Sequence, residues 1–286
     1  MKRNLLVFLF SLALLCGFAP AACADVGPKP SVQIQFEQMD DSLCYATLLS
    51  LTPSTGPSSV WDGDENHIWN YNLDLEIWRA FAEYQDPDGF YFLQEGWQVN
   101  ETKSFAWTYY PPRTFKVLLY YPETGEFRSS GIYERYAFDS YYTIDLGSPG
   151  PELLLRKSYD YTWEVISLLA RIALTLLIEM ALALVFRFRS KQLLFLIGKA
   201  NLVTQVSLNL LLSFIDYNQG SMAFVFFYLL LELGVFVLEA VYYLRAFPRA
   251  VSVPIRRGKI IFYALAANAL SFAGGMWIAV RIPGIF

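Results

Sequence analysis

Short runs of alternating hydrophobic and polar residues dominate residues 25–158. In the clearest run, residues 31–37, Val32, Ile34 and Phe36 share one face, and polar side chains occupy the other. Strict alternation is typical of a β-strand with one buried face. Further β-rich runs, separated by turn sequences at residues 86–89 and 122–125, predict strands at residues 44–50, 89–94, 102–108, 114–121 and 141–146.

One segment of this region has helical spacing instead. Leu75, Trp78 and Phe81 recur three residues apart, and Asn72 is a residue type that caps helix N-termini. We therefore predict a helix from residue 72 to about residue 84. A β-rich region with one inserted helix predicts a small, sandwich-like domain at residues 25–158.

Strongly apolar segments occupy the rest of the chain, at residues 163–186, 193–215, 222–244 and 260–282. Each has 23 or 24 residues, enough for a helix to cross a hydrocarbon layer about 30 Å thick. Basic residues cluster in the connections after the first and third segments, whereas residues 216–221 contain none. By the positive-inside rule, the basic connections face the cytoplasm and residues 25–158 lie outside. Residues 159–286 are therefore predicted to form a four-helix transmembrane bundle.

The first 24 residues have the pattern of a secretory signal peptide: two basic residues, an apolar run at residues 5–15 and small residues before a cleavage point after Ala24. An uncleaved anchor helix and a lipoprotein modified at Cys16 or Cys23 are the alternatives. Cleavage leaves Cys44 as the only cysteine, so no disulfide is expected within the mature chain.

The charges divide in the same place as the hydropathy. The chain is 55% apolar and 17% charged, with a mean hydropathy of +0.33, which is too hydrophobic for a soluble protein. Residues 25–158 contain 20 acidic and 9 basic residues, and residues 159–286 contain 6 acidic and 11 basic ones. Because the predicted exported domain is acidic, we expect no nucleic-acid partner.

The loop at residues 53–69 is the candidate ligand site of the exported domain. Exposed tryptophans beside acidic residues are suited to gripping a sugar ring or a peptide, but large rings also pack loops against sheets. A calcium loop is not expected, since the later positions lack the required glycine and glutamate. The candidate residues are Trp61, Asp62, Asp64, His67 and Trp69.

No catalytic arrangement is visible in the sequence. His67 is the only histidine, which excludes a histidine-rich zinc site, and no Gly-x-Ser-x-Gly motif is present. Carboxylates are too numerous in residues 25–158 to single out a glycosidase pair. We therefore expect neither enzymatic activity nor a cofactor nor a metal.

Polar residues within the predicted membrane helices are the most informative feature of the sequence. Such residues are costly in hydrocarbon and should face the interior of the bundle. Three of them recur at i, i+4 spacing on one stripe of the second helix, whereas Lys199 points away from that stripe. The predicted intramembrane polar site consists of Arg171, Glu179, Asn201, Gln205, Asn209, Glu232, Glu239 and Asn268.

Depth along the helices predicts two polar layers. Arg171 can pair with Glu232 in one of them. The other layer holds two carboxylates and two amides, from Glu179, Glu239, Asn201 and Asn268. Two carboxylates without a basic partner cannot both stay ionised in a low dielectric, so one should be protonated or a cation should bind. The alternative is that these groups hydrogen-bond the helices together, helped by small residues in the fourth helix.

Several stretches resemble an uncharacterised family of bacterial multi-pass membrane proteins with an exported N-terminal domain. The resemblance rests on Ala24-Asp-Val-Gly-Pro-Lys-Pro-Ser31, Asn201-Leu-Val-Thr-Gln205, Glu232 with Glu239, Ala267-Asn-Ala-Leu-Ser-Phe-Ala-Gly274 and Ile282-Pro-Gly-Ile-Phe286. It covers nearly the whole chain and implies a bacterial cytoplasmic-membrane location. It implies no activity.

Two functions remain in view from the sequence. In the first, the exported domain binds or senses a cell-envelope ligand, and the helices anchor it or relay the signal. In the second, the bundle transports an ion, a proton or a small solute through its intramembrane Glu and Asn residues. The expected partners are the lipid bilayer, an envelope ligand, and a membrane partner protein or a second copy of the chain.

Overall fold

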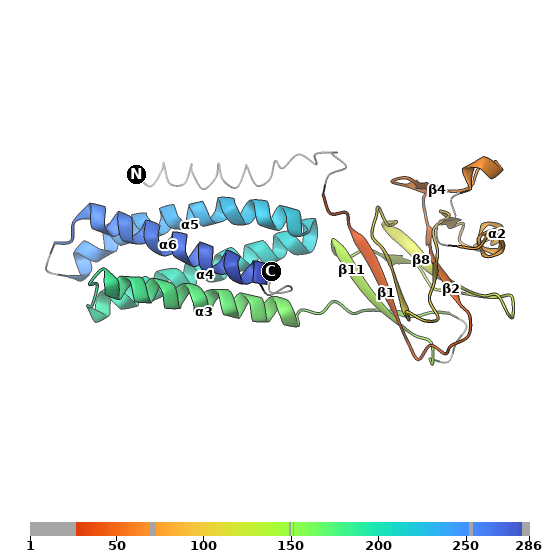
Figure 1. The fold of residues 1–286 in the computed structure, drawn as a ribbon, viewed down its shortest axis with the longest axis horizontal. Coiled ribbons are helices and arrows are strands. Elements are labelled where there is room, and N and C mark those ends of the chain that lie inside the picture. Colours follow the sequence, from red (N-terminus) through yellow and green to blue (C-terminus); the bar gives the residue numbers. More distant parts are fainter. Residues whose placement is uncertain (1–26, 69–72, 149, 151, 252–253, 282–286) are drawn as a thin grey trace. The chain divides into compact units, whose positions relative to one another are not determined.

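The computed structural model describes residues 27–68, 73–148, 150, 152–251 and 254–281. The predicted signal peptide, Trp69 and Asn72 lie outside these residues. The chain divides into two units, one of strands at Pro28–Asp160 and one of helices that includes Tyr161–Phe286 (Figure 1).

The first sheet of the β-rich unit is built around its first strand. Its order is β12-β11-β1-β7, formed by Leu155–Lys157, Asp139–Asp145, Ser31–Glu37 and Ser104–Trp107. β1 pairs in parallel with β11, where Ser31 faces Asp139, and antiparallel with β7, where Val32 faces Trp107. β1 occupies the residues that alternation predicted, 31–37.

The second sheet has six strands, with β10-β8-β2-β5 as its main path, β6 beside β2 and β9 beside β8. These strands are Tyr133–Glu134, Thr114–Tyr121, Tyr45–Ser50, Tyr91–Phe92, Trp97–Gln98 and Glu126–Ser129. A separate hairpin pairs β3, Ser54–Thr55, with β4, Ser58–Ser59. β2 does not alternate, because it is buried along its whole length.

Both sheets contribute to one hydrophobic core. Ile34 of β1 and Phe105 of β7 lie in this core with Leu48 of β2 and Val117 of β8. The opposite face of β2, including Leu49, belongs to a second core that is shared with α2. The second sheet is therefore covered on both faces.

The helix α2, Leu75–Glu83, supplies that cover through Trp78 and Phe81, both almost fully buried. The predicted start at Asn72 is wrong, because Asp74 has extended backbone angles and forms the N-cap. Leu75 is also not part of the buried face, since 41% of it is exposed and Ile77 lies inside instead.

The second unit consists of long helices in mutual contact: α3 packs on α4 and α6, and α5 packs on α4 and α6. Their bounds are Thr162–Val185, Lys191–Gln219, Ser221–Ala250 and Arg257–Arg281. Three of them, α3, α4 and α5, are long and apolar enough to cross a membrane. The predicted loop at residues 216–221 reduces to Gly220, whose φ of 82° favours glycine.

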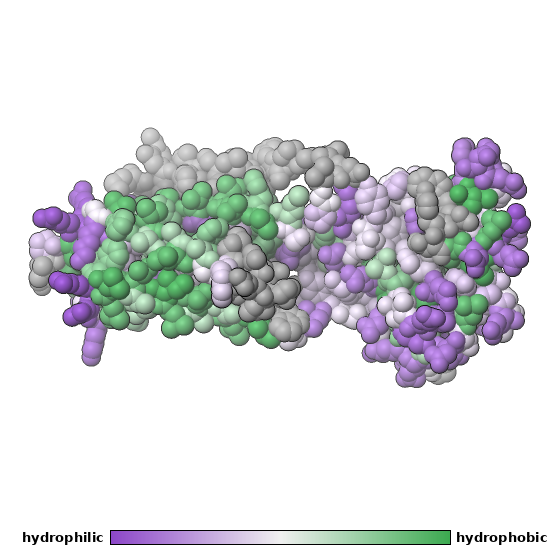
Figure 2. Space-filling view, in the orientation of Figure 1, coloured by the Kyte–Doolittle hydropathy of each residue, from purple (hydrophilic) through white to green (hydrophobic). Residues whose placement is uncertain are grey.

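The surface of the helical unit matches this composition. Its sides are hydrophobic, and hydrophilic residues gather at the end where α3 meets α4 and α5 meets α6 (Figure 2). Exposed Leu177, Phe195, Phe214 and Phe262 contribute to the apolar sides. Such a surface is suited to contact with lipid chains.

Candidate functional site: a buried polar network among the helices

The polar stripe predicted on α4 faces the interior of the helical unit. Asn201, Gln205 and Asn209 lie one helical turn apart, and each is at most 3% exposed. Lys199 is exposed on another face. α4 therefore presents three amides to the helices around it.

Glu179 of α3 lies at one end of the network and is fully buried. One of its carboxyl oxygens accepts a hydrogen bond from the Asn201 amide nitrogen, Nδ2. The same nitrogen lies 3.1 Å from the hydroxyl oxygen of Tyr243 on α5. The Tyr263 hydroxyl of α6 donates to the backbone carbonyl of Glu179 at 3.1 Å. Side chains of α4 and α6 thus bond to Glu179 directly, and Tyr243 of α5 is joined to it through Asn201.

Glu239 of α5 forms a second centre and is 1% exposed. The Thr204 hydroxyl of α4 donates to its Oε1 at 2.6 Å, and Nδ2 of Asn268 on α6 donates to its Oε2 at 2.9 Å. The Thr204 hydroxyl also lies 3.2 Å from the backbone carbonyl oxygen of Asn201. Both carboxyl groups are therefore bound to neighbouring positions of α4.

The network contains more acceptors than donors. Within the described parts of the chain, Oε1 of Glu179, Oδ1 of Asn201 and Oδ1 of Asn268 are buried and accept no hydrogen bond, whereas one buried amide donor, Nε2 of Gln205, lacks an acceptor. Neither Glu179 nor Glu239 forms an ion pair there. A buried acceptor without a donor is costly, and a buried carboxylate without a countercharge costs more. A proton or a cation would relieve both costs.

A second polar group involves Arg171 of α3. Its Nη1 donates to Oδ1 of Asn209 at 3.1 Å, and its guanidinium lies 5.1 Å from the ring centre of Phe224. Glu232 lies beside Tyr228 on the same helix. The structure thus places Arg171 with Asn209 and Glu232 with Tyr228, rather than Arg171 with Glu232. Depth along the helices therefore did not predict the partner of Arg171.

Three residues of the network were not among those predicted: Thr204, Tyr243 and Tyr263. Their hydroxyl groups are common in apolar helices and carry no charge that would draw attention to them. Spacing offered a signal, since Thr204 follows Asn201 by three residues and Tyr243 follows Glu239 by four.

An aromatic cluster adjoins the Glu179 end of the network. Phe188 packs edge-on against Phe247 and Tyr263, with ring centres 5.3 and 5.2 Å apart, and Tyr243 lies 5.1 Å from Phe247. All these residues are buried. Tyr243 and Tyr263 belong to both groups, so the polar network ends at a packed hydrophobic core.

In the β-rich unit, most residues of the candidate ligand loop bond to one another. The Trp61 ring packs edge-on against Trp78 at 5.2 Å, and its indole nitrogen donates to the backbone carbonyl of Asp64 at 2.8 Å. The Asp64 side chain caps a short 3-10 helix, Glu65–His67. Trp61 thus takes part in packing, and the ligand role of this loop stays a prediction.

Asp62 and His67 of this loop form an exposed ion pair, with Oδ2 2.8 Å from Nδ1. The Asp62 carboxylate raises the pKa of His67 above its ordinary value. A backbone hydrogen bond from Asp64, followed by the bond to His67, lowers the pKa of Asp62. In the described residues, no group of three or more His, Cys, Asp or Glu side chains could hold a metal ion.

Cys44 is fully buried beside Tyr121, and burial raises the pKa of its thiol to about 12. A thiol with this pKa stays protonated at neutral pH and is a poor nucleophile. Its environment is therefore that of a core residue.

Comparisons with known protein families, curated proteins and solved structures find no match to this chain.

Proposed function

We propose that the helical unit binds and exchanges protons at Glu179 and Glu239, as part of a small ion or solute transporter. The observation that carries this proposal is the fully buried Glu179, whose Oε1 accepts no hydrogen bond in the described structure. A second carboxyl group, that of Glu239, bonds to the same stretch of α4. A site short of both protons and positive charge gains from taking up either.

The proposal includes a topology. All the long helices, α6 included, span the cytoplasmic membrane of a bacterium as a four-helix bundle, and the β-rich unit lies outside as a sandwich behind a cleaved signal peptide. The basic connections support this orientation. Cysteines at Asn218 and Arg189, placed one at a time in a chain without its native cysteines, test it. Only Asn218→Cys should react with an impermeant thiol reagent added outside; the reverse pattern would overturn the topology.

The interior of the helices supports a function better than the candidate ligand loop does. In the loop, the Trp61 ring and indole nitrogen are occupied by Trp78 and Asp64. In the helices, four buried acceptors lack donors within the described residues, on Glu179, Asn201, Glu232 and Asn268. Binding of an envelope ligand by the β-rich unit is therefore the weaker of the two functions.

The test is proton flux into proteoliposomes that contain a pH-sensitive dye, driven by a pH gradient. We expect Glu179→Gln and Glu239→Gln to reduce the flux at least tenfold while the protein stays folded, because each removes a titrating group and keeps the side-chain shape. Glu37→Gln, the same change in an exposed ion pair of the β-rich unit, is the control and should leave flux unchanged. Equal flux in all of these proteins would refute the proposal.

A further inference from the structure

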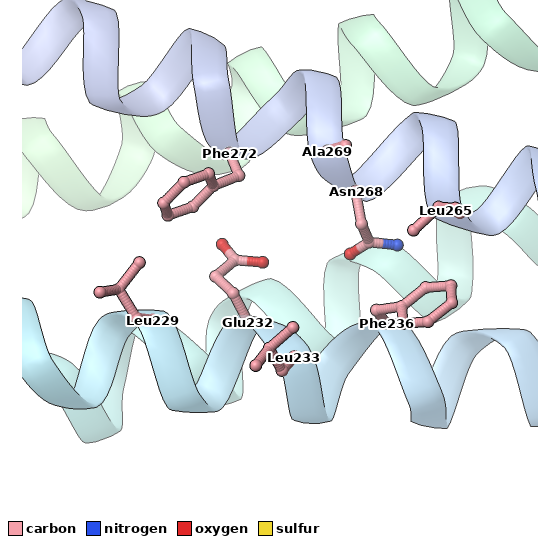
Figure 3. A pocket seen from close by; sticks show the side chains of 8 residues that line it. All are labelled: Leu229, Glu232, Leu233, Phe236, Leu265, Asn268, Ala269 and Phe272. Carbon is pink, nitrogen blue, oxygen red and sulfur yellow. The ribbon is translucent and has the colours of Figure 1, made fainter.

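A pocket of about 250 Å³ lies between α5 and α6, beside the polar network. Figure 3 shows Glu232 of α5 and Asn268 of α6 pointing toward one another across it. The remaining lining is apolar, from Leu229, Leu233, Phe236, Leu265, Ala269 and Phe272. The pocket is thus a hydrophobic recess with two polar groups inside.

The pocket opens onto the outer surface of the helices. Leu229, Leu233 and Leu265 line it and are 48%, 64% and 49% exposed. Glu232 lies 11 residues after the start of α5 at Ser221, which is roughly 17 Å along a helix that rises 1.5 Å per residue. In a hydrocarbon layer about 30 Å thick, a molecule would reach this pocket from among the lipid chains.

The polar groups of the pocket offer hydrogen-bond acceptors. Oε2 of Glu232 and Oδ1 of Asn268 are buried without a donor in the described structure. Asn268 as a residue is 5% exposed, and its Nδ2 already donates to Glu239 and to the backbone carbonyl of Ala264. A ligand that only accepts hydrogen bonds would find no free donor on the Asn268 amide. The chemistry of the pocket selects a ligand that donates.

The charges around the pocket indicate which kind of hydrogen-bond donor it binds. Glu179 and Glu239 are buried and Glu232 is partly buried, whereas Arg171 already contacts Asn209 and Lys199 is exposed. A cationic donor satisfies both the unpaired acceptors and the negative charge, and hydrogen bonds to charged groups are stronger than neutral ones. A volume of about 250 Å³ is many times the roughly 10–15 Å³ that a cavity needs to hold one water molecule, so it holds a small head group and the first part of a chain.

We propose that this pocket binds the primary ammonium group of a membrane-dissolved amine, with its N–H groups donating to Glu232 and Asn268 and its apolar chain lying in the lipid. The binding does not depend on proton exchange by Glu179 and Glu239. Because Asn268 contacts both the pocket and Glu239, it would link the amine to the proposed proton site.

The test uses a dodecylamine that carries a photoreactive diazirine near its amino group, added to the full chain in phosphatidylcholine nanodiscs. Mass spectrometry should locate the cross-links on α5 around Glu232 and on α6 around Asn268. Dodecylamine should compete at least tenfold better than dodecanol, which donates but has no charge, and than dodecyltrimethylammonium, which has charge but no N–H. A second set of nanodiscs contains phosphatidylethanolamine, whose head group is also a primary ammonium. If the pocket binds a lipid head group, this lipid should abolish labelling; if it binds a free amine, labelling should persist.

Two variants complete the test. Glu232→Gln should reduce labelling at least tenfold, and Ala269→Phe should do the same by filling the pocket without changing a polar group. Glu179→Gln is the control, because Glu179 does not line the pocket and bonds to Asn201 rather than to Asn268. It should keep its labelling, which separates this proposal from the proposed proton exchange. Equal labelling of wild type, Glu232→Gln and Ala269→Phe would overturn the proposal, as would equal competition by dodecanol.

Discussion

The two units of this protein bury charged groups in opposite ways. In the β-rich unit, Nζ of Lys116 lies 2.9 Å from Oδ2 of Asp86 and 2.5 Å from Oδ2 of Asp88. In the helical unit, Glu179 and Glu239 receive hydrogen bonds only from amides and hydroxyls among the described contacts. The first site carries its own countercharge, whereas the second has no countercharge among the described ion pairs.

The pKa of Lys116 illustrates the first arrangement. Burial acts to lower it, but the bonds to Asp88 and Asp86 outweigh burial and raise it above its ordinary value. A raised lysine pKa stabilises the folded state at pH values below the pKa of the unfolded chain. This contribution is lost only when the pH rises through the higher pKa of the folded state, so the stability that the pair provides does not change near neutral pH. A permanent ion pair of this kind stabilises the fold, whereas the carboxyl groups of the helical unit, which have no such partner among the described residues, are the ones at which we propose proton exchange.

The largest effect should come from breaking the permanent pair. Asp86→Asn leaves the buried Lys116 with only the half-exposed Asp88, and should cost the β-rich unit about 3 kcal/mol of unfolding free energy. Tryptophan fluorescence during denaturation measures this, since five of the seven tryptophans lie in this unit. Asp88→Asn is the control and should cost less than about 1 kcal/mol; equal losses would contradict the assignment.

Replacing the whole pair should cost less than breaking it. Asp86→Asn combined with Lys116→Met removes both charges together and keeps the Oδ1 that accepts from the backbone N–H groups of Asp88 and Phe90. We expect an unfolding free energy within about 1.5 kcal/mol of wild type. The same denaturation experiment measures it. A double variant as unstable as Asp86→Asn would indicate that the charges themselves are needed to hold this part of the unit together.

The helical site should tolerate neutralisation. Glu239→Gln keeps an acceptor for Thr204 or Asn268, and its new N–H can donate to the unpaired Oδ1 of Asn268. We expect a change below about 1 kcal/mol, measured as the thermal unfolding of the chain in nanodiscs. Glu239→Leu, which removes the hydrogen bonds as well, should be clearly less stable. A large loss in Glu239→Gln would mean that an ionised Glu239 is part of the fold.

The smallest effect is expected at the exposed pair of Asp62 and His67. Asp62→Asn should lower the pKa of His67 toward its ordinary value, because it removes the hydrogen bond and the charge that raise it. The pair stabilises the fold at pH values below the ordinary histidine pKa. This contribution disappears as the pH rises through the raised pKa that His67 has in the folded protein. The NMR titration of this single histidine gives the answer, and an unchanged pKa would contradict the pairing.

Local pattern predicted those parts of the fold that local burial determines. β1 was predictable because one of its faces is buried and the other is not. The two-residue strands β6 and β10 were not, because their pairing with β2 and β8 is set by the tertiary structure. The predicted helix start at Asn72 was wrong because it rested on the capping preference of one residue type. The backbone becomes helical only after Asp74.

The same distinction applies to the site. The i, i+4 stripe on α4 follows from helix geometry, so the inward direction of Asn201, Gln205 and Asn209 could be predicted. The partner of Arg171 could not, because it depends on how each helix is rotated about its axis. The pocket beside Asn268 was also hidden, since most of its lining is ordinary leucine and phenylalanine.

The position of β1 within its sheet has a consequence for biosynthesis. Its neighbours are β7 and β11, so Val32 pairs with Trp107 and Ser31 with Asp139. A ribosome makes β1 first, and its parallel partner emerges more than a hundred residues later. One edge of β1 lacks its strand until β7, Ser104–Trp107, is made, and the other lacks its strand until β11 is made. Pairings this distant in sequence form slowly. The β-rich unit should therefore reach its final fold late, only after nearly all of it has been synthesised.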